Sequence, residues 1–116
     1  MTKNSDSTRF YSDKQEKSVC EELGGRQQPS SGSGKFRKGD VLIPELMLVE
    51  CKCCMSPKSS FSVKKDWIEK NKEEAFTQRV SNSCIAFNFE PDGDNYYVIN
   101  SRLMKFLVEK LGEENG

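Results

Sequence analysis

The segment from Asp40 to Lys52 holds the pattern that most constrains the fold of this chain. Two short aliphatic runs, residues 41–43 and 47–49, lie on either side of Pro44 and Glu45. Aliphatic and β-branched runs separated by a few turn residues are typical of an antiparallel hairpin. A hairpin centred on Glu45 pairs residues 43 with 47, 42 with 48 and 41 with 49, and it sets Asp40 directly opposite Glu50.

This pairing brings two carboxylates and one ammonium group onto the same face of the hairpin. Directly opposed side chains have Cβ atoms about 4.5–5.5 Å apart, so two facing carboxylates repel unless a cation lies between them. Lys52 follows Glu50 by two residues, and it therefore projects from the same face about 6.6 Å further along the strand. The pattern predicts a metal site formed by Asp40 and Glu50 with Lys52 beside it. A shift of register by one residue would turn Asp40 to the other face.

Length and composition indicate one small domain. The chain has 116 residues, of which 34% are hydrophobic and 31% are charged, and its formal net charge is zero. A domain of this length can bury a core without disulfides. The zero net charge counts mildly against a nucleic-acid-binding domain, which is more often basic.

Five cysteines and no histidine are present. A zinc site would normally show paired Cys-x-x-Cys units or histidines at ligand spacing, so the cysteines are interpreted as ordinary thiols. On the hairpin, Cys51 and Cys53 point away from Glu50, into the core. No apolar run approaches the roughly 20 residues that cross a bilayer, and no signal peptide is visible. We therefore expect a cytoplasmic protein without a membrane segment.

Periodicity predicts the order helix, strand, strand, strand, helix, strand, strand, helix. The expected helices are residues 13–23, 63–79 and 101–111, capped in the last two cases by Ser62 and Ser101 and ended in the last by Gly112. The expected strands are residues 26–28, the two arms of the hairpin (40–53), 84–89 and 96–99. Residues 1–12 and 113–116 are expected to be tails around a domain of residues 13–112. An apolar stripe on the second helix places Trp67 and Phe76 in the core.

This order, together with Asp40 and the triplet Glu50-Cys51-Lys52, resembles the PD-(D/E)xK nuclease superfamily, and most closely its small Holliday-junction-resolvase-like members of phage and archaeal type. The resemblance runs from about residue 14 to residue 111. It implies an α/β fold with a restriction-endonuclease-like core, in which a central mixed sheet is flanked by helices. The Pro-Asp of the superfamily name is Gly39-Asp40 here. Members often add a glutamate from the first helix, and Glu16 is the best match, with Glu21 and Glu22 as alternatives.

The resemblance implies a metal-dependent DNA endonuclease. Hard oxygen ligands such as those of Asp40 and Glu50 suit Mg²⁺ or Mn²⁺, and in this family a main-chain carbonyl, here that of Cys51, commonly completes the metal shell. Glu16 would add a ligand or hold a metal-bound water. The ammonium of Lys52 can position the attacking water or stabilise the developing negative charge.

Basic and polar residues on both sides of the hairpin are candidates for DNA contacts. Lysines and arginines that contact phosphates carry no base information, so they predict binding by shape rather than by sequence. The Ser-Gly-Ser-Gly loop also resembles the DNA-contacting loop of the family. The candidates are Ser31, Ser33, Lys35, Arg37, Lys38, Lys58, Lys64, Lys65 and Gln78.

The expected substrate is branched DNA, such as a four-way junction. Resolving a junction takes two symmetric cuts, which favours a homodimer. The last helix and the strand at 96–99 are two candidate interfaces. Two other functions remain open: a nuclease that nicks or trims ordinary duplex or flap DNA, and a nuclease-fold module that binds DNA or protein without cutting. Phage recombination in the host cytoplasm, DNA packaging and host defence would all suit such an enzyme. In the plainest alternative, Glu50 and Lys52 are an exposed pair with no chemical role.

Overall fold

The computed structural model describes residues 3–28 and 40–115, with side chains from residue 8 onward. The predicted order of helices and strands is confirmed. The elements are α1 (Lys3–Leu23), β1 (Arg26–Gln27), β2 (Asp40–Ile43), β3 (Met47–Lys52), α2 (Lys65–Thr77), β4 (Asn82–Phe87), β5 (Tyr96–Val98) and α3 (Ser101–Asn115).

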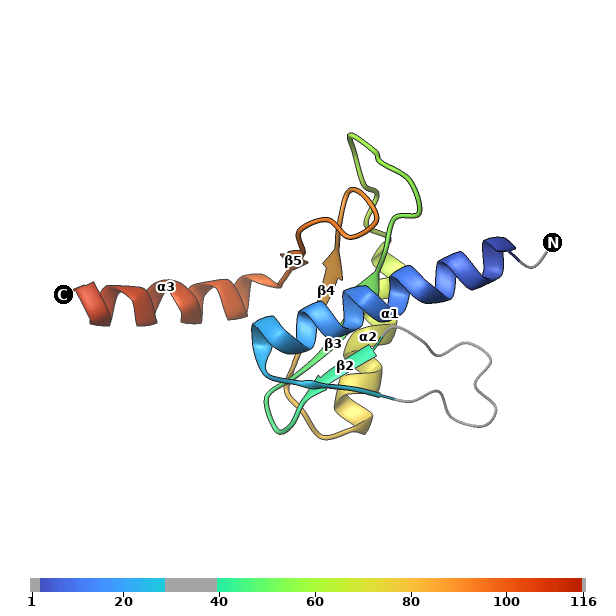
Figure 1. The fold of residues 1–116 in the computed structure, drawn as a ribbon. Helices are drawn as coiled ribbons and strands as arrows, with labels where there is room; N and C mark the ends of the chain where they lie inside the picture. Colours follow the sequence, from blue (N-terminus) through green and yellow to red (C-terminus); the bar gives the residue numbers. More distant parts are fainter. Residues whose placement is uncertain (1–2, 29–39, 116) are drawn as a thin grey trace.

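The strands form one mixed sheet in the order β1-β2-β3-β4-β5. Strands β3 and β4 run parallel, whereas the other neighbouring pairs are antiparallel. Parallel neighbours need a long crossover connection, and α2 supplies it between β3 and β4. Helices α1 and α2 lie on the two faces of the sheet, while α3 extends away from it (Figure 1). The α/β class with a central mixed sheet is confirmed.

Two apolar clusters, one on each face, hold the helices to the sheet. On the α1 face, Val19 packs with Val41 and Val49 of the hairpin, and all three are fully buried. On the α2 face, Ala75 packs with Leu42 and Leu48. Because successive strand residues point to opposite faces, the hairpin contributes to both clusters. Asp40, Glu50 and Lys52 follow the same alternation, which places their side chains on the α2 face.

Helix α2 buries a different stripe from the predicted one. Its buried residues are Asn71 and Ala75, whereas Phe76 is 82% exposed. The expectation that Phe76 lies in the core is therefore wrong, and Trp67 is only partly buried. The reason lies in the contacts with the sheet. The amide of Asn71 donates to two strand carbonyls, and when Asn71 faces the sheet the side chain of Phe76 points to solvent.

The helix ends also differ from the expectation. Helix α1 begins at Lys3, so residues 3–12 continue the helix instead of forming a tail, because extending an existing helix needs no new nucleation. Helix α2 begins at Lys65 without a side-chain cap, so Ser62 does not cap it. The side chain of Asn100, not Ser101, accepts the backbone N–H of Leu103 at the start of α3. Helix α3 runs through Gly112 to Asn115, so residues 113–115 are helical as well.

Candidate functional site

The hairpin has the predicted register. Asp40 lies opposite Glu50, and the pairs between residues 41–43 and 47–49 follow in step. A tight turn sets this register: the backbone N–H of Leu46 donates to the carbonyl of Ile43 at 2.9 Å. Pro44 at the second turn position and Glu45 at the third, with φ of 69°, follow the pattern of a type II turn. The turn therefore determines which residues share a face with Asp40.

Lys52 lies against the second carboxylate of the pair. Its Nζ is 2.9 Å from Oε2 of Glu50, and the two side chains are 30% and 20% exposed. A contact at this depth is screened less than a surface ion pair. Lys52 and Glu50 are thus in direct contact, and Asp40 is the strand partner of Glu50.

An aromatic ring from α2 also contacts the ammonium of Lys52. Nζ lies 4.3 Å from the centroid of Trp67, within the range of a cation–π interaction. Sequence reasoning assigned Trp67 to the core, and the pattern held no signal of this contact because fifteen positions separate the two residues. Trp67 and Glu50 together define where the positive charge of Lys52 lies.

Gln15 of α1 reaches the end of β3. This side chain is 4% exposed, and its Nε2 donates to the main-chain carbonyl of Lys52 at 3.1 Å. Nε2 also lies 3.5 Å from Oδ1 of Asn95, while Oε1 is buried without a donor among the described residues. Gln15 therefore ties α1 to the strand that carries Lys52. Sequence reasoning missed it, although its place four residues before Val19 was a signal of burial.

Glu16, the neighbour of Gln15, was the predicted helix contribution to the site. Its Oε1 accepts a hydrogen bond from Nε2 of Gln27 at 2.9 Å. Burial raises the pKa of the Cys51 thiol well above its usual value, and the charges of Glu16 and then Asp40 add to this rise. Both carboxylates therefore lie within electrostatic reach of one thiol. No three acidic or thiol side chains of residues 8–28 and 40–115 gather at metal-ligand geometry, and a role for Glu16 stays a prediction.

A hollow of about 620 Å³ opens beside Lys52. It lies between the loop that follows β3 and the start of α2, and its lining includes Lys52, Lys58, Phe61, Ser62 and Trp67. Of the predicted DNA contacts, Lys58 thus lines the same hollow as Lys52. Hydroxyl, ammonium and aromatic groups share this surface.

The remaining predicted contacts are distributed more widely. Lys64 lies 5.8 Å from the Trp67 ring, and Lys65 forms an exposed ion pair with Glu69 at 3.8 Å. Gln78 exchanges hydrogen bonds with Gln28 at 2.8 and 3.0 Å, which joins the end of α2 to the residue after β1. Ser31, Ser33, Lys35, Arg37 and Lys38 lie outside the described residues.

The five cysteines are free thiols. Cys51 packs against the cluster on the α1 face, as the alternation predicted. Sγ of Cys53 contacts the carbonyl of Tyr11 at 3.6 Å and accepts from Asn88. Burial raises the pKa of Cys84 to about 12. These thiols contribute to the packing between α1, β3 and β4.

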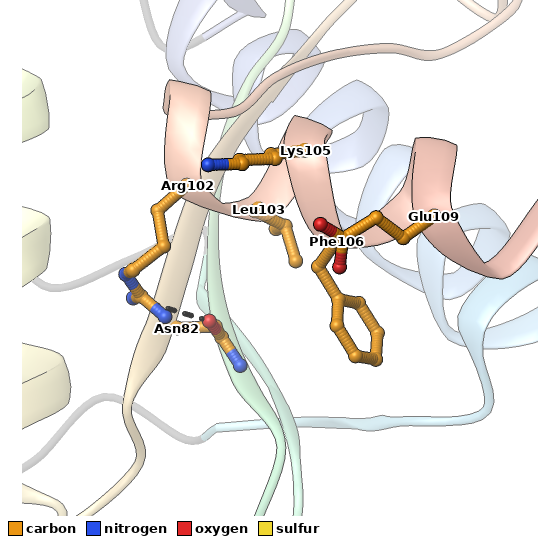
Figure 2. A pocket seen from close by; sticks show the side chains of 6 residues that line it. All are labelled: Asn82, Arg102, Leu103, Lys105, Phe106 and Glu109. Carbon is orange, nitrogen blue, oxygen red and sulfur yellow. Dashed lines mark hydrogen bonds between the residues drawn. The ribbon is translucent and has the colours of Figure 1, made fainter.

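A second hollow, of about 470 Å³, lies at the start of α3 and contains none of the predicted catalytic residues. Figure 2 shows Arg102 reaching Asn82, with Leu103 and Phe106 projecting from α3 toward the same side. The guanidinium donates to the main-chain carbonyl of Ser81 at 3.1 Å and to Oδ1 of Asn82 at 3.4 Å. These contacts join the base of α3 to the beginning of β4.

Comparison with known proteins adds no relative: the chain matches no protein-family model, no curated protein and no solved structure. Among the described helices, none is both long enough and apolar enough to pass through a bilayer.

Proposed function

We propose that this chain is a Mg²⁺- or Mn²⁺-dependent DNA endonuclease with a restriction-endonuclease-like core, selective for branched DNA such as a four-way junction. One observation carries the proposal: Asp40 and Glu50 are direct partners on adjacent strands, and Nζ of Lys52 lies 2.9 Å from Glu50. Two carboxylates with a lysine at this spacing meet the chemical needs of phosphodiester hydrolysis. The open hollow that Lys52 lines would give a substrate access to its side chain.

The donor set fits a hard divalent cation. Mg²⁺ is commonly held by one or two carboxylates together with waters and substrate phosphates, and Asp40 and Glu50 supply two such ligands on one face. The carbonyl of Cys51 is the proposed additional ligand; the carboxylate of Glu16 accepts a hydrogen bond from Gln27 on the α1 face, across the sheet from Glu50, and is not proposed as one. When bound, such an ion lowers the pKa of a coordinated water and polarises the phosphate.

Lys52 has two proposed tasks. Its ammonium can hold the attacking water close to the phosphorus, and it can stabilise the negative charge that develops on the phosphate oxygens. Glu50 and Trp67 fix its position, since they contact Nζ from two sides. Removing one such preorganised positive or hydrogen-bonding group typically lowers kcat by about 10²- to 10³-fold.

Substrate contacts would come from the surface around the hollow. Lys58 lines it, and Lys64 lies near its Trp67 wall. Together with residues 31–38 and Lys65, these groups would contact the sugar-phosphate backbone, which favours selection by DNA shape. Two symmetric cuts across a junction would require a homodimer. A cytoplasmic setting, including that of a phage-infected host cell, suits this activity.

The test is cleavage of four-way junction, flap, nicked and linear DNA in the presence of Mg²⁺. We expect symmetric junction cuts that fall at least a hundredfold in Glu50→Gln and in Lys52→Ala. The matched controls are Asp66→Asn and Lys70→Ala, which alter an exposed ion pair on α2 that has no proposed role in the site and should cut like the wild type. Equal cutting of linear DNA would point instead to a general nicking or trimming nuclease.

A second measurement tests the metal site independently of substrate. Millimolar Mg²⁺ should raise the melting temperature of the wild-type protein, since it relieves the repulsion between Asp40 and Glu50, and the rise should disappear in Asp40→Asn. DNA binding without cutting, together with no response to Mg²⁺ or Mn²⁺, would replace the nuclease by a binding module of the same fold.

A further inference from the structure

Aromatic rings gather at the end of the sheet beside Lys52. Neighbouring ring centroids in this cluster lie between 4.6 and 6.0 Å apart, which is the usual spacing of interacting aromatic side chains. The loop after β3 lies beside the turn between β4 and β5 at this end (Figure 1), where the N–H of Lys58 donates to the carbonyl of Phe89 at 2.8 Å. The members of the cluster are Phe61, Trp67, Phe87, Phe89 and Tyr96. The cluster begins where β3 and β4 end, because Lys52 and Phe87 are the paired last residues of these strands.

Phe61 presents part of its ring to the hollow beside Lys52. The ring of Phe87 stacks on it, with centroids 4.6 Å apart and planes 21° apart, and the ring of Trp67 lies 6.0 Å away. Phe61 is nevertheless partly exposed, and it lines the hollow together with Trp67 and Lys52. Two neighbouring rings thus hold Phe61 in place while part of its surface stays accessible. A ring held in this way loses little side-chain freedom when a planar partner stacks on it.

The polar part of the wall carries positive charge. Serine hydroxyls and a second ammonium group, that of Lys58, line the hollow, and no acidic residue of the described chain is among its lining residues. Lys58 is exposed, and no carboxylate of residues 8–28 and 40–115 forms an ion pair with it. Lys52, in contrast, is paired with Glu50. The charge of Lys58 therefore favours an anionic group in the hollow. The serines are Ser56, Ser60 and Ser62.

An aromatic ring beside an ammonium group and hydroxyls suits a nucleotide whose base is unpaired. A base within a duplex has both faces stacked, whereas an unpaired base can stack on an aromatic side chain while its phosphate contacts a lysine. The volume of about 620 Å³ lies within the range of sites that hold small ligands. We propose that the hollow binds an unpaired nucleotide of single-stranded DNA, with the base on Phe61 and the phosphate at Lys58.

The position of the hollow connects this site to cleavage. Lys52 lines the hollow and contacts Glu50, so a strand bound there would pass beside the proposed catalytic group. The substrate class is then branched DNA with unpaired nucleotides at the branch, such as a flap or an incompletely paired junction. This role in cleavage rests on the proposed nuclease function, whereas the binding of a single strand does not.

Binding in EDTA tests the site separately from hydrolysis. Trp67 is the only tryptophan of the chain, so its fluorescence reports directly on the wall of the hollow. An oligothymidine of about 12 nucleotides should quench this fluorescence. It should also bind about tenfold more tightly than an abasic strand of equal length and than a blunt duplex, since neither of these offers an unpaired base to the ring.

Substitutions separate stacking from packing. Phe61→Leu keeps an apolar side chain but removes the ring, and it should weaken binding of the oligothymidine about five- to tenfold. Phe61→Tyr keeps the ring and should bind like the wild type. Lys58→Ala should weaken binding and lower its dependence on salt. The matched controls are Phe76→Leu, at a ring that is 82% exposed on α2, and Lys72→Ala on the same helix, and both should bind like the wild type.

The outcomes distinguish the nucleotide site from the nuclease. Equal affinity for the abasic strand, or unchanged binding in Phe61→Leu, would overturn the site. So would displacement of the oligothymidine by polyglutamate at equal charge concentration, because that result would show a surface for anions of any kind. A protein that binds the oligothymidine as expected but cuts no DNA would keep the site and lose the nuclease. A protein that cuts fully paired junctions but does not bind the oligothymidine would keep the nuclease and lose the site.

Discussion

Asn71 holds α2 against the sheet through two hydrogen bonds, and its removal should measurably destabilise the fold. The side chain is 3% exposed, and its Nδ2 donates to the carbonyls of Leu48 at 3.3 Å and Cys84 at 2.9 Å. Each bond contributes about 1 kcal/mol net, so Asn71→Ala should lower the free energy of unfolding by about 2 kcal/mol from the bonds alone. With about 4 °C per kcal/mol for a domain of this length, the melting temperature should fall by about 8 °C.

The assay is urea unfolding followed by circular dichroism, with Lys72→Ala on the exposed side of the same helix as control. Lys72→Ala should stay within about 0.5 kcal/mol of the wild type. Asn71→Asp keeps the shape but turns an acceptor toward two carbonyls. Burial and those carbonyls raise the folded-state pKa of this carboxyl above its unfolded value, so its stability deficit should grow as pH rises from 5 to 8. An Asn71→Ala loss no larger than that of Lys72→Ala would refute the anchoring role.

Three further outcomes are expected. Gly25→Ala should lower the free energy of unfolding by about 1–3 kcal/mol, because an added Cβ would lie 2.8 Å from the carbonyl oxygen of Leu42. At Gly112 an added Cβ meets open space, so Gly112→Ala should increase helicity. Equal melting curves for the two variants would contradict this expectation. Burial raises the pKa of Cys84 to about 12 and that of Cys51 above its usual value, so at pH 8 both remain neutral thiols, and Ellman's reagent should label them in denaturant but not in the native protein. On the proposed nuclease, Trp67→Leu should lower kcat about fivefold through the loss of about 1 kcal/mol of cation–π interaction with Lys52, with DNA binding kept; an unchanged kcat would remove Trp67 from the site.

The hairpin could be predicted because its information is local. Pro44 and Glu45 form the turn, the aliphatic runs on either side have equal length, and the pairing of Asp40 with Glu50 follows from counting outward. The contact between Lys52 and Glu50 follows in turn from the two-residue repeat of a strand. No long-range information enters any of these steps.

The second helix shows why other features could not be predicted. Periodicity reports which residues are apolar, but the face that a helix buries depends on what the neighbouring strands require. Here the carbonyls of Leu48 and Cys84 bind Asn71, and the apolar side chain of Phe76 is left in solvent. Gln15 was missed for the same reason, since its partner Lys52 lies 37 positions away.

The sequence by itself therefore determined the order of the elements, the register of the hairpin and the contact between Glu50 and Lys52. Only the tertiary structure decided which helix faces are buried, which ring contacts the ammonium of Lys52, and that no side chain of α3 is buried. The physical reason is one of range. Turn geometry and strand alternation act over a few residues, whereas the burial of a helix face depends on groups that only the folded chain brings together.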